Sequence, residues 1–191
     1  MRSRKHAAQA LAALALAACL AGCGGQARHS HQATGVLAAG SVGRLPAVTR
    51  ALTAADLQKD SSLAGLAAML RRWGYLGGWQ RTFQGESRRL TLVVSRSLTF
   101  RSGPGAAAFV AYLNKHVGVF YPFAVSKPLT LAGQSGWLIK PPPCACHLAE
   151  PLYVGVTAAG RQVRWLEING PHATSALLAS LLAKLPVASR A

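Results

Sequence analysis

Acidic residues are scarce in this chain. Its 191 residues contain five aspartates and glutamates against 21 lysines and arginines, which gives a formal net charge of +16. The acids are Asp56, Asp60, Glu86, Glu150 and Glu167. They offer no neighbouring pair of carboxylates for general acid and base catalysis, and the chain has no nucleophile elbow and no phosphate-binding glycine loop. The sequence therefore predicts a protein that is not an enzyme.

A hydrophobic run long enough to span a membrane is also missing. The apolar stretch from Ala7 to Gly22 is shorter than the ~20 residues that a helix needs to cross a bilayer. Arg2, Arg4 and Lys5 precede it, so the segment has the basic and apolar regions of an export signal.

The end of this segment, Leu20-Ala21-Gly22-Cys23, resembles a bacterial lipobox. The resemblance implies a lipoprotein in which Cys23 is diacylated, becomes the new N-terminus and anchors the protein on the extracytoplasmic face of the cell membrane. Leu16-Ala17-Ala18-Cys19 is a second candidate box, and a plain cleaved signal or an uncleaved anchor are further alternatives. We favour Cys23 because Gly24-Gly25 begins a flexible stretch.

The chain divides into three parts. Residues 1–22 are the predicted signal peptide, residues 23–52 are rich in small and polar residues and read as a flexible tether, and residues 53–186 form one domain. Loss of the signal leaves 18 basic and five acidic side chains, a net charge of +13. For an exported protein this charge favours anionic lipids or acidic cell-wall polymers as partners and argues against nucleic acid. The sequence identifies no protein partner.

The domain alternates helical and strand patterns. Thr53-Ala54-Ala55-Asp56 is a capping box that opens a helix ending at Gly74. Gly65 and the run Asp60-Ser61-Ser62 weaken this helix midway, so two pieces are the alternative. Helices are also predicted after Ser102 and after Pro171. Strands are predicted at 79–83, 88–100, 129–131, 137–140, 152–157 and 162–168, joined mainly as hairpins. The order predicts an α+β fold, with an antiparallel sheet of about five to seven strands and three helices packed mainly on one face.

The strand at 88–100 shows the clearest alternation. Its apolar residues share one face, whereas Ser95 and Ser97 fall on the other, which predicts a sheet with one wet face. Arg96 lies on the apolar face, where a charge is costly, so we expect a β-bulge or an edge position there.

This layout is similar to that of a known group of proteins. Four features follow one another: a helix running into Gly74-Tyr75-Leu76-Gly77-Gly78, then Arg81-Thr82-Phe83-Gln84-Gly85, a long strand to Phe100 and a helix opening at Gly105-Ala106. This order resembles that of small actinobacterial lipoproteins with a PsbP/Mog1-like layout. The resemblance implies a non-enzymatic module of the cell surface or envelope, and it supplies no catalytic residue.

Cysteine is scarce too, and only Cys144 and Cys146 remain as thiols once the signal and the acylated Cys23 are set aside. In Cys144-Ala145-Cys146-His147, the two thiols can form a tight disulfide, stay inert, or join His147 in holding a soft metal ion such as Cu(I). No other cofactor is predicted. The sequence therefore favours a membrane-anchored, non-catalytic binding or accessory module of the cell envelope, with a metal-binding or thiol redox protein centred on these three residues as the alternative.

Overall fold

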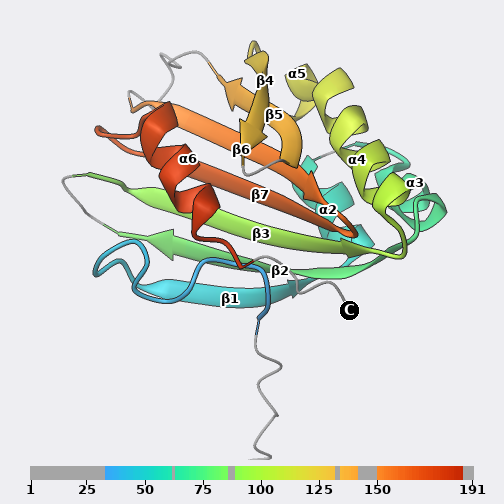
Figure 1. Ribbon diagram of the computed structural model, residues 1–191, viewed down its shortest axis with the longest axis horizontal. Helices are drawn as coiled ribbons and strands as arrows, with labels where there is room; N and C mark the ends of the chain where they lie inside the picture. Colours follow the sequence, from blue (N-terminus) through green and yellow to red (C-terminus); the bar gives the residue numbers. More distant parts are fainter. Residues whose placement is uncertain (1–32, 62, 86–88, 132–133, 142–149, 187–191) are drawn as a thin grey trace, which may run out of the picture. The chain divides into compact units, whose positions relative to one another are not determined.

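The computed structural model describes residues 33–61, 63–85, 89–131, 134–141 and 150–186. Residues 33–191 form a compact unit that is separate from residues 1–32. Within it lies one sheet of seven strands in the order β1-β2-β3-β7-β6-β5-β4, and each neighbouring pair is antiparallel (Figure 1). The strands are β1 (Ala47–Leu52), β2 (Tyr75–Gln84), β3 (Leu92–Phe100), β4 (Val125–Leu131), β5 (Gln134–Lys140), β6 (Leu152–Ala159) and β7 (Gln162–Asn169). The α+β prediction is confirmed.

Five helices lie among the described residues, whereas the sequence predicted three. They are α2 (Ala54–Ser61), α3 (Leu66–Arg72), α4 (Gly103–Lys115), α5 (Val117–Phe120) and α6 (Ser175–Ala183). The first predicted helix is broken in two because Gly65, with a φ of 80°, caps α3 in a left-handed conformation. The capping box holds as predicted: the Thr53 amide donates to Asp56 Oδ2 at 2.7 Å, and the Asp56 amide donates to Thr53 Oγ1 at 3.2 Å.

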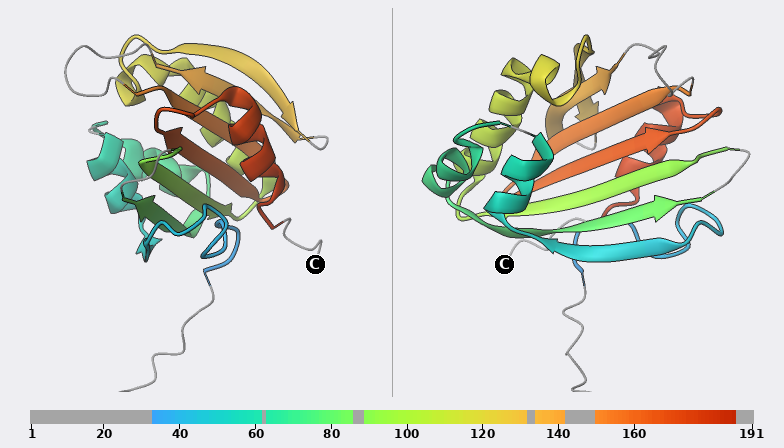
Figure 2. Two further views of the ribbon diagram at one scale, coloured as in Figure 1. Left: turned by 90° about the vertical axis from the view of Figure 1, so that its left-hand side faces the viewer. Right: turned by 180° about the vertical axis from the view of Figure 1, so that it is seen from behind.

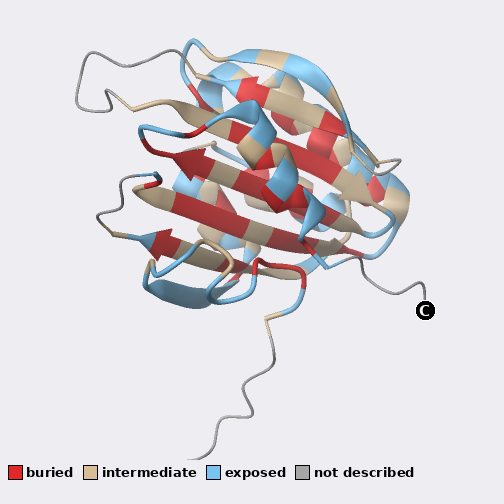
Figure 3. Ribbon diagram, turned by 60° about the vertical axis from the view of Figure 1, so that its left-hand side comes forward, coloured by how far each residue is buried: buried red, intermediate tan, exposed pale blue. Residues whose placement is uncertain are grey.

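The sheet is covered on both faces. Helices α2 to α5 supply one apolar cluster, in which Leu57, Leu70 and Phe109 pack on the side of the sheet that carries Phe100 and Trp165. Helix α6 lies on the other side together with the segment 33–45, as Figures 1 and 2 show. Four of the five helices thus share one face. The central strands are mostly buried, whereas β1 at one edge is exposed (Figure 3).

The predicted wet face is therefore wrong. Ser95 is fully buried and Ser97 nearly so. The segment 33–45 lies over them, and the amide of Leu37 donates to Ser95 Oγ at 3.0 Å. On this face, Ser95 therefore binds a covering segment of the same chain.

The boundary of the predicted tether also changes. Residues 33–52 belong to the folded unit, since Leu37 is fully buried and residues 47–52 form β1, which pairs with β2 along its whole length. Its many small residues predict a linker when the segment is considered alone. In the structure it is ordered, because it pairs with the edge of β2 and packs on the face of the sheet beside α6.

Arg96 is neither at an edge nor at a bulge. It lies on β3 between β2 and β7, directly opposite Gln80 and Trp165 in an unbroken register. Its charge is accommodated by an ion pair with Glu167 instead. The cost of burial on this face is thus offset by a partner that lies 71 residues further along the chain.

Candidate functional site

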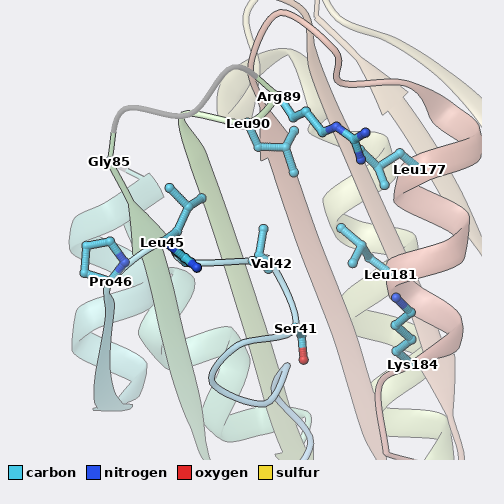
Figure 4. Close-up of a pocket in the computed structure, with 12 residues that line it drawn as sticks. Ser41, Val42, Leu45, Pro46, Gly85, Arg89, Leu90, Leu177, Leu181 and Lys184 are labelled. Atoms are coloured by element: carbon cyan, nitrogen blue, oxygen red, sulfur yellow. The ribbon is translucent and has the colours of Figure 1, made fainter.

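A hollow of about 500 Å³ lies between α6 and the segment 41–46. In Figure 4, Leu177, Leu181 and Lys184 reach into it from α6, and Val42 and Leu45 face them from the opposite wall. Its described lining consists of Ser41, Val42, Gly43, Arg44, Leu45, Pro46, Gly85, Arg89, Leu90, Leu177, Leu181 and Lys184. Hollows of this size accommodate small organic ligands.

The helical wall is placed by a cap and a glycine. Thr174 caps α6 by accepting a hydrogen bond from the Leu177 amide at 3.1 Å. Beneath the helix, a Cβ atom at Gly155 of β6 would lie only 2.5 Å from Leu182 Cδ1. The glycine therefore lets α6 approach the sheet closely, and the helix presents Leu177, Leu181 and Lys184 along one side.

The opposite wall is held by contacts with β2 and β3. Arg81 of β2 donates to the carbonyl oxygen of Leu37 at 2.7 Å, and the Gln84 amide donates to the carbonyl oxygen of Pro46 at 3.2 Å. These bonds fix both ends of the segment 37–46. Its middle, which includes Val42, Arg44 and Leu45, lines the hollow.

The hollow combines apolar side chains with positive charge. Its cationic groups come from Arg44, Arg89 and Lys184, and no aspartate or glutamate occurs in the described lining. Arg44 and Lys184 are both exposed. Across the part of the chain that the structure describes, the side chains of these two residues make no hydrogen bond or ion pair. Two cations beside six apolar side chains suit a ligand with an anionic group and a hydrocarbon portion.

A second cluster of charge lies on the other face, around Arg96. Its guanidinium forms an ion pair with Glu167, donates from Nε to Gln80 Oε1 at 2.8 Å, and lies 4.7 Å from the ring centroid of Trp165. Burial lowers the pKa of Arg96, but Glu167, Tyr121 and Asp60 act together in the opposite direction, so the net change raises the pKa. The guanidinium therefore stays charged, and it is paired with the side chain of Glu167.

Tyr121 closes this cluster from above the sheet. Its hydroxyl accepts a hydrogen bond from Trp165 Nε1 at 3.0 Å. Burial, followed by the nearby carboxylate of Glu167, raises the pKa of Tyr121 well above its ordinary value, so the phenol stays protonated. The cavity beside these groups measures about 130 Å³, and most of the polar groups around it already have partners within the protein. This arrangement serves the packing of α2 and α5 against the sheet.

A third hollow, of about 560 Å³, lies between α4 and the β4–β5 hairpin. It is lined mostly by small and apolar side chains, and no charged side chain occurs in its described lining. It therefore offers less chemical selectivity than the hollow beside α6.

Four residues that the sequence singled out lie outside the described residues: Cys23, Cys144, Cys146 and His147. Within the described ranges, no group of three or more histidine, cysteine, aspartate or glutamate side chains is arranged to hold a metal ion.

The aromatic residues near the end of α3 belong to the core. Trp73 packs against Tyr112 with ring centroids 5.2 Å apart, and Tyr75 packs against Phe100 at 5.5 Å. The hollow beside α6 was missed because Arg44 and Leu45 fall in the expected tether. One signal was present: Leu177, Leu181 and Lys184 recur at i, i+4 and i+7, which places a cation at the end of an apolar helix stripe.

Comparison with known proteins gives little to set beside this geometry. No family model and no curated protein sequence matches the chain. A similar solved structure is the crystal structure of the extracellular domain of PknH from Mycobacterium tuberculosis, with a TM-score of 0.43 and 11% identity over 72% of this chain and 80% of that one. At this level of similarity the match carries no argument about fold or function. Among the helices that the structure describes, none has the length and hydrophobicity to cross a bilayer.

Proposed function

We propose that this chain is an exported lipoprotein, acylated at Cys23, whose folded unit is a non-catalytic binding module for an anionic amphiphile at the extracytoplasmic face of the cell membrane. The lipobox-like Leu20-Ala21-Gly22-Cys23 supports the anchor. The hollow between α6 and the segment 41–46 supports the binding role.

One observation carries the choice of ligand. Arg44 and Lys184 reach the same apolar hollow, and neither has a carboxylate partner within the described part of the chain. A cation with an internal partner, such as Arg96, is already neutralised. Cations left at the rim of an apolar hollow instead lower the cost of bringing an anion there, and the leucines beside them accept its hydrocarbon portion.

The ligand class is tested by titration with an amphiphilic fluorescent probe. The chain from residue 24 onward is titrated with dansyl-undecanoic acid, and the probe is then displaced with lysophosphatidylglycerol or lysophosphatidylcholine. We expect saturable binding, with displacement by the anionic lipid at lower concentration than by the zwitterionic one. Equal displacement by both lipids contradicts recognition of the anion, and absence of saturable binding contradicts the function itself.

A charge-matched pair of variants locates the site. The double variant Arg44→Gln/Lys184→Gln is expected to bind the probe about tenfold more weakly, because two partly screened charges contribute about 1 kcal/mol or less each. Arg71→Gln/Arg72→Gln is the control, since these exposed residues lie in the last turn of α3 on the opposite face and remove the same charge. Equal loss in both variants would indicate only a response to net charge.

The anchor is tested separately by metabolic labelling with a radioactive fatty acid. Cys23→Ala is expected to abolish the label, and Cys19→Ala is expected to retain it. The reverse pattern would move the anchor to Cys19. If both variants keep the label, a lipoprotein anchor at this segment is ruled out.

A further inference from the structure

Exposed large apolar side chains gather in one short segment. Of the five in the part of the chain that the structure describes, Val119, Phe123 and Val125 are exposed by 50%, 88% and 61% and lie within seven residues of one another. The other two, Val48 and Leu76, lie on different strands. Isolated apolar residues on a surface need no explanation, but a cluster of this kind indicates a contact.

The backbone presents Phe123 in an unusual way. Its φ is 60°, a left-handed conformation that a bulky side chain rarely adopts, and it is the one non-glycine residue with positive φ in the described ranges. The turn that holds it is anchored by Tyr121, which is buried and bound to Trp165, and the Ala124 amide donates to the carbonyl oxygen of Tyr121 at 3.1 Å. The fold thus keeps an aromatic ring in solvent at a conformational cost and gains no packing from it.

The surroundings of this segment are basic. Between Arg101 and Ala149 the sequence contains no acidic residue. Lys115 at the end of α4, Lys127 on β4 and Lys140 on β5 are all exposed. Lys140 lies directly opposite Val125 in the β4–β5 register, and Lys127 is two residues from Val125 on the same side of β4, so apolar and cationic groups share one surface.

We propose that Phe123 and Val125, with Lys127 and Lys140, form a docking surface for an anionic lipid bilayer. Aromatic and aliphatic side chains at an exposed turn can enter the boundary between headgroups and acyl chains, while the lysines contact anionic headgroups. The charge favours a lipid surface, because a protein partner would have to supply a carboxylate-rich face to match it. This docking rests on the proposed location at the membrane but not on the hollow beside α6.

Vesicle flotation tests the surface without the lipid anchor. The chain from residue 24 onward, which retains the whole compact unit, is floated with vesicles of phosphatidylcholine alone or mixed with phosphatidylglycerol. Binding is expected to require phosphatidylglycerol, and Phe123→Asn is expected to reduce it about fivefold. Asparagine is chosen because it tolerates the left-handed conformation, so the variant should fold at least as well as the original.

The controls separate this surface from general basicity and from the hollow. Leu76→Asn and Val48→Asn remove exposed apolar side chains elsewhere and should leave flotation unchanged. Lys127→Gln/Lys140→Gln should reduce the dependence on phosphatidylglycerol. Phe123→Asn should bind dansyl-undecanoic acid as well as the original chain does, and Arg44→Gln/Lys184→Gln should still float with the vesicles. Failure of the bilayer-docking proposal can therefore be told apart from failure of the ligand-binding proposal. Three results would overturn the proposal: Phe123→Asn floats as well as the original chain, Leu76→Asn loses flotation equally, or the original chain does not float. The last of these results would point to a protein partner.

Discussion

The two faces of the sheet differ in whether a carboxylate neutralises the positive charge on them. On the face covered by α2 to α5, Arg96 is buried and held by Glu167, Gln80 and Trp165. On the face covered by α6, Arg44 and Lys184 stand at the edge of an apolar hollow without an internal carboxylate in the described residues. Sequence composition counts all of these as positive charges. Only the pairing distinguishes a cation that stabilises the fold from one that is available to a ligand.

The pairing also means that a large number of charged groups does not by itself indicate a place for a ligand. Arg50, Gln80, Arg96 and Trp165 form a row across β1, β2, β3 and β7, and each has a partner in the row or beside it. Such a network makes the position of every member depend on the others. The hollow beside α6 has fewer polar groups, but they point toward space that a ligand can occupy.

The largest effect is expected from breaking the buried pair. Glu167→Gln keeps the shape of the side chain but leaves the Arg96 charge without its counterion, and we expect the free energy of unfolding to fall by about 3 kcal/mol. Urea unfolding followed by tryptophan fluorescence measures the change. Arg96→Met/Glu167→Leu should recover most of the loss, because both charges are then removed together.

The exposed ion pair of the same region is the control for this prediction. Arg50 and Asp60 are joined at 2.8 Å, but their side chains are 43% and 36% exposed. Asp60→Asn should therefore change the free energy of unfolding by less than about 1 kcal/mol. If Glu167→Gln costs no more than Asp60→Asn, the buried pair has no special role in stability.

A smaller effect is expected from lifting α6 off the sheet. Gly155→Val introduces atoms into the space occupied by Leu182 and Leu178, so we expect a loss of about 1–3 kcal/mol from overpacking. Because α6 is one wall of the hollow, the same variant should also bind dansyl-undecanoic acid more weakly. Unchanged probe affinity in a destabilised variant would show that the hollow does not depend on the position of α6.

Removing one hydroxyl tests how tightly the buried network is connected. Tyr121→Phe leaves Trp165 Nε1 without its acceptor, and the expected cost is about 1 kcal/mol in the free energy of unfolding. Probe binding should not change, since Tyr121 packs with the cluster on the α2–α5 side of the sheet. A fall in probe affinity would mean that the two faces are coupled through the sheet.

The smallest effect concerns pH and the capping box of α2. Hydrogen bonds from Thr53, with smaller contributions from Arg50 and Lys59, lower the pKa of Asp56 below its ordinary value of 3.8. Because the folded pKa is the lower one, the stabilisation is present above pH 3.8 and is lost as pH falls through the folded value. The urea midpoints of the original chain and Asp56→Asn should differ slightly at neutral pH and converge in acid. A difference that persists in acid would show that the carboxylate charge is not its source.

Local patterns were sufficient for much of the fold. The hairpin of β6 and β7, the capping box at Thr53 and the apolar stripe of α6 depend on residues close together in the chain, and their periods are visible in the sequence. Arg96 was misplaced because its counterion Glu167 is supplied by a strand far along the chain. Ser95 and Ser97 were misread for the same reason, since the segment that covers them was expected to be tether.

The sequence by itself determined an α+β chain with a large excess of positive charge, because composition, hydrophobic period and capping act locally. The tertiary structure decided which charges are paired, that residues 33–52 belong to the folded unit, and that α6 and the segment 41–46 enclose a hollow. Those outcomes depend on distances between side chains that lie tens of residues apart. Such distances are fixed only when the sheet brings its strands into register.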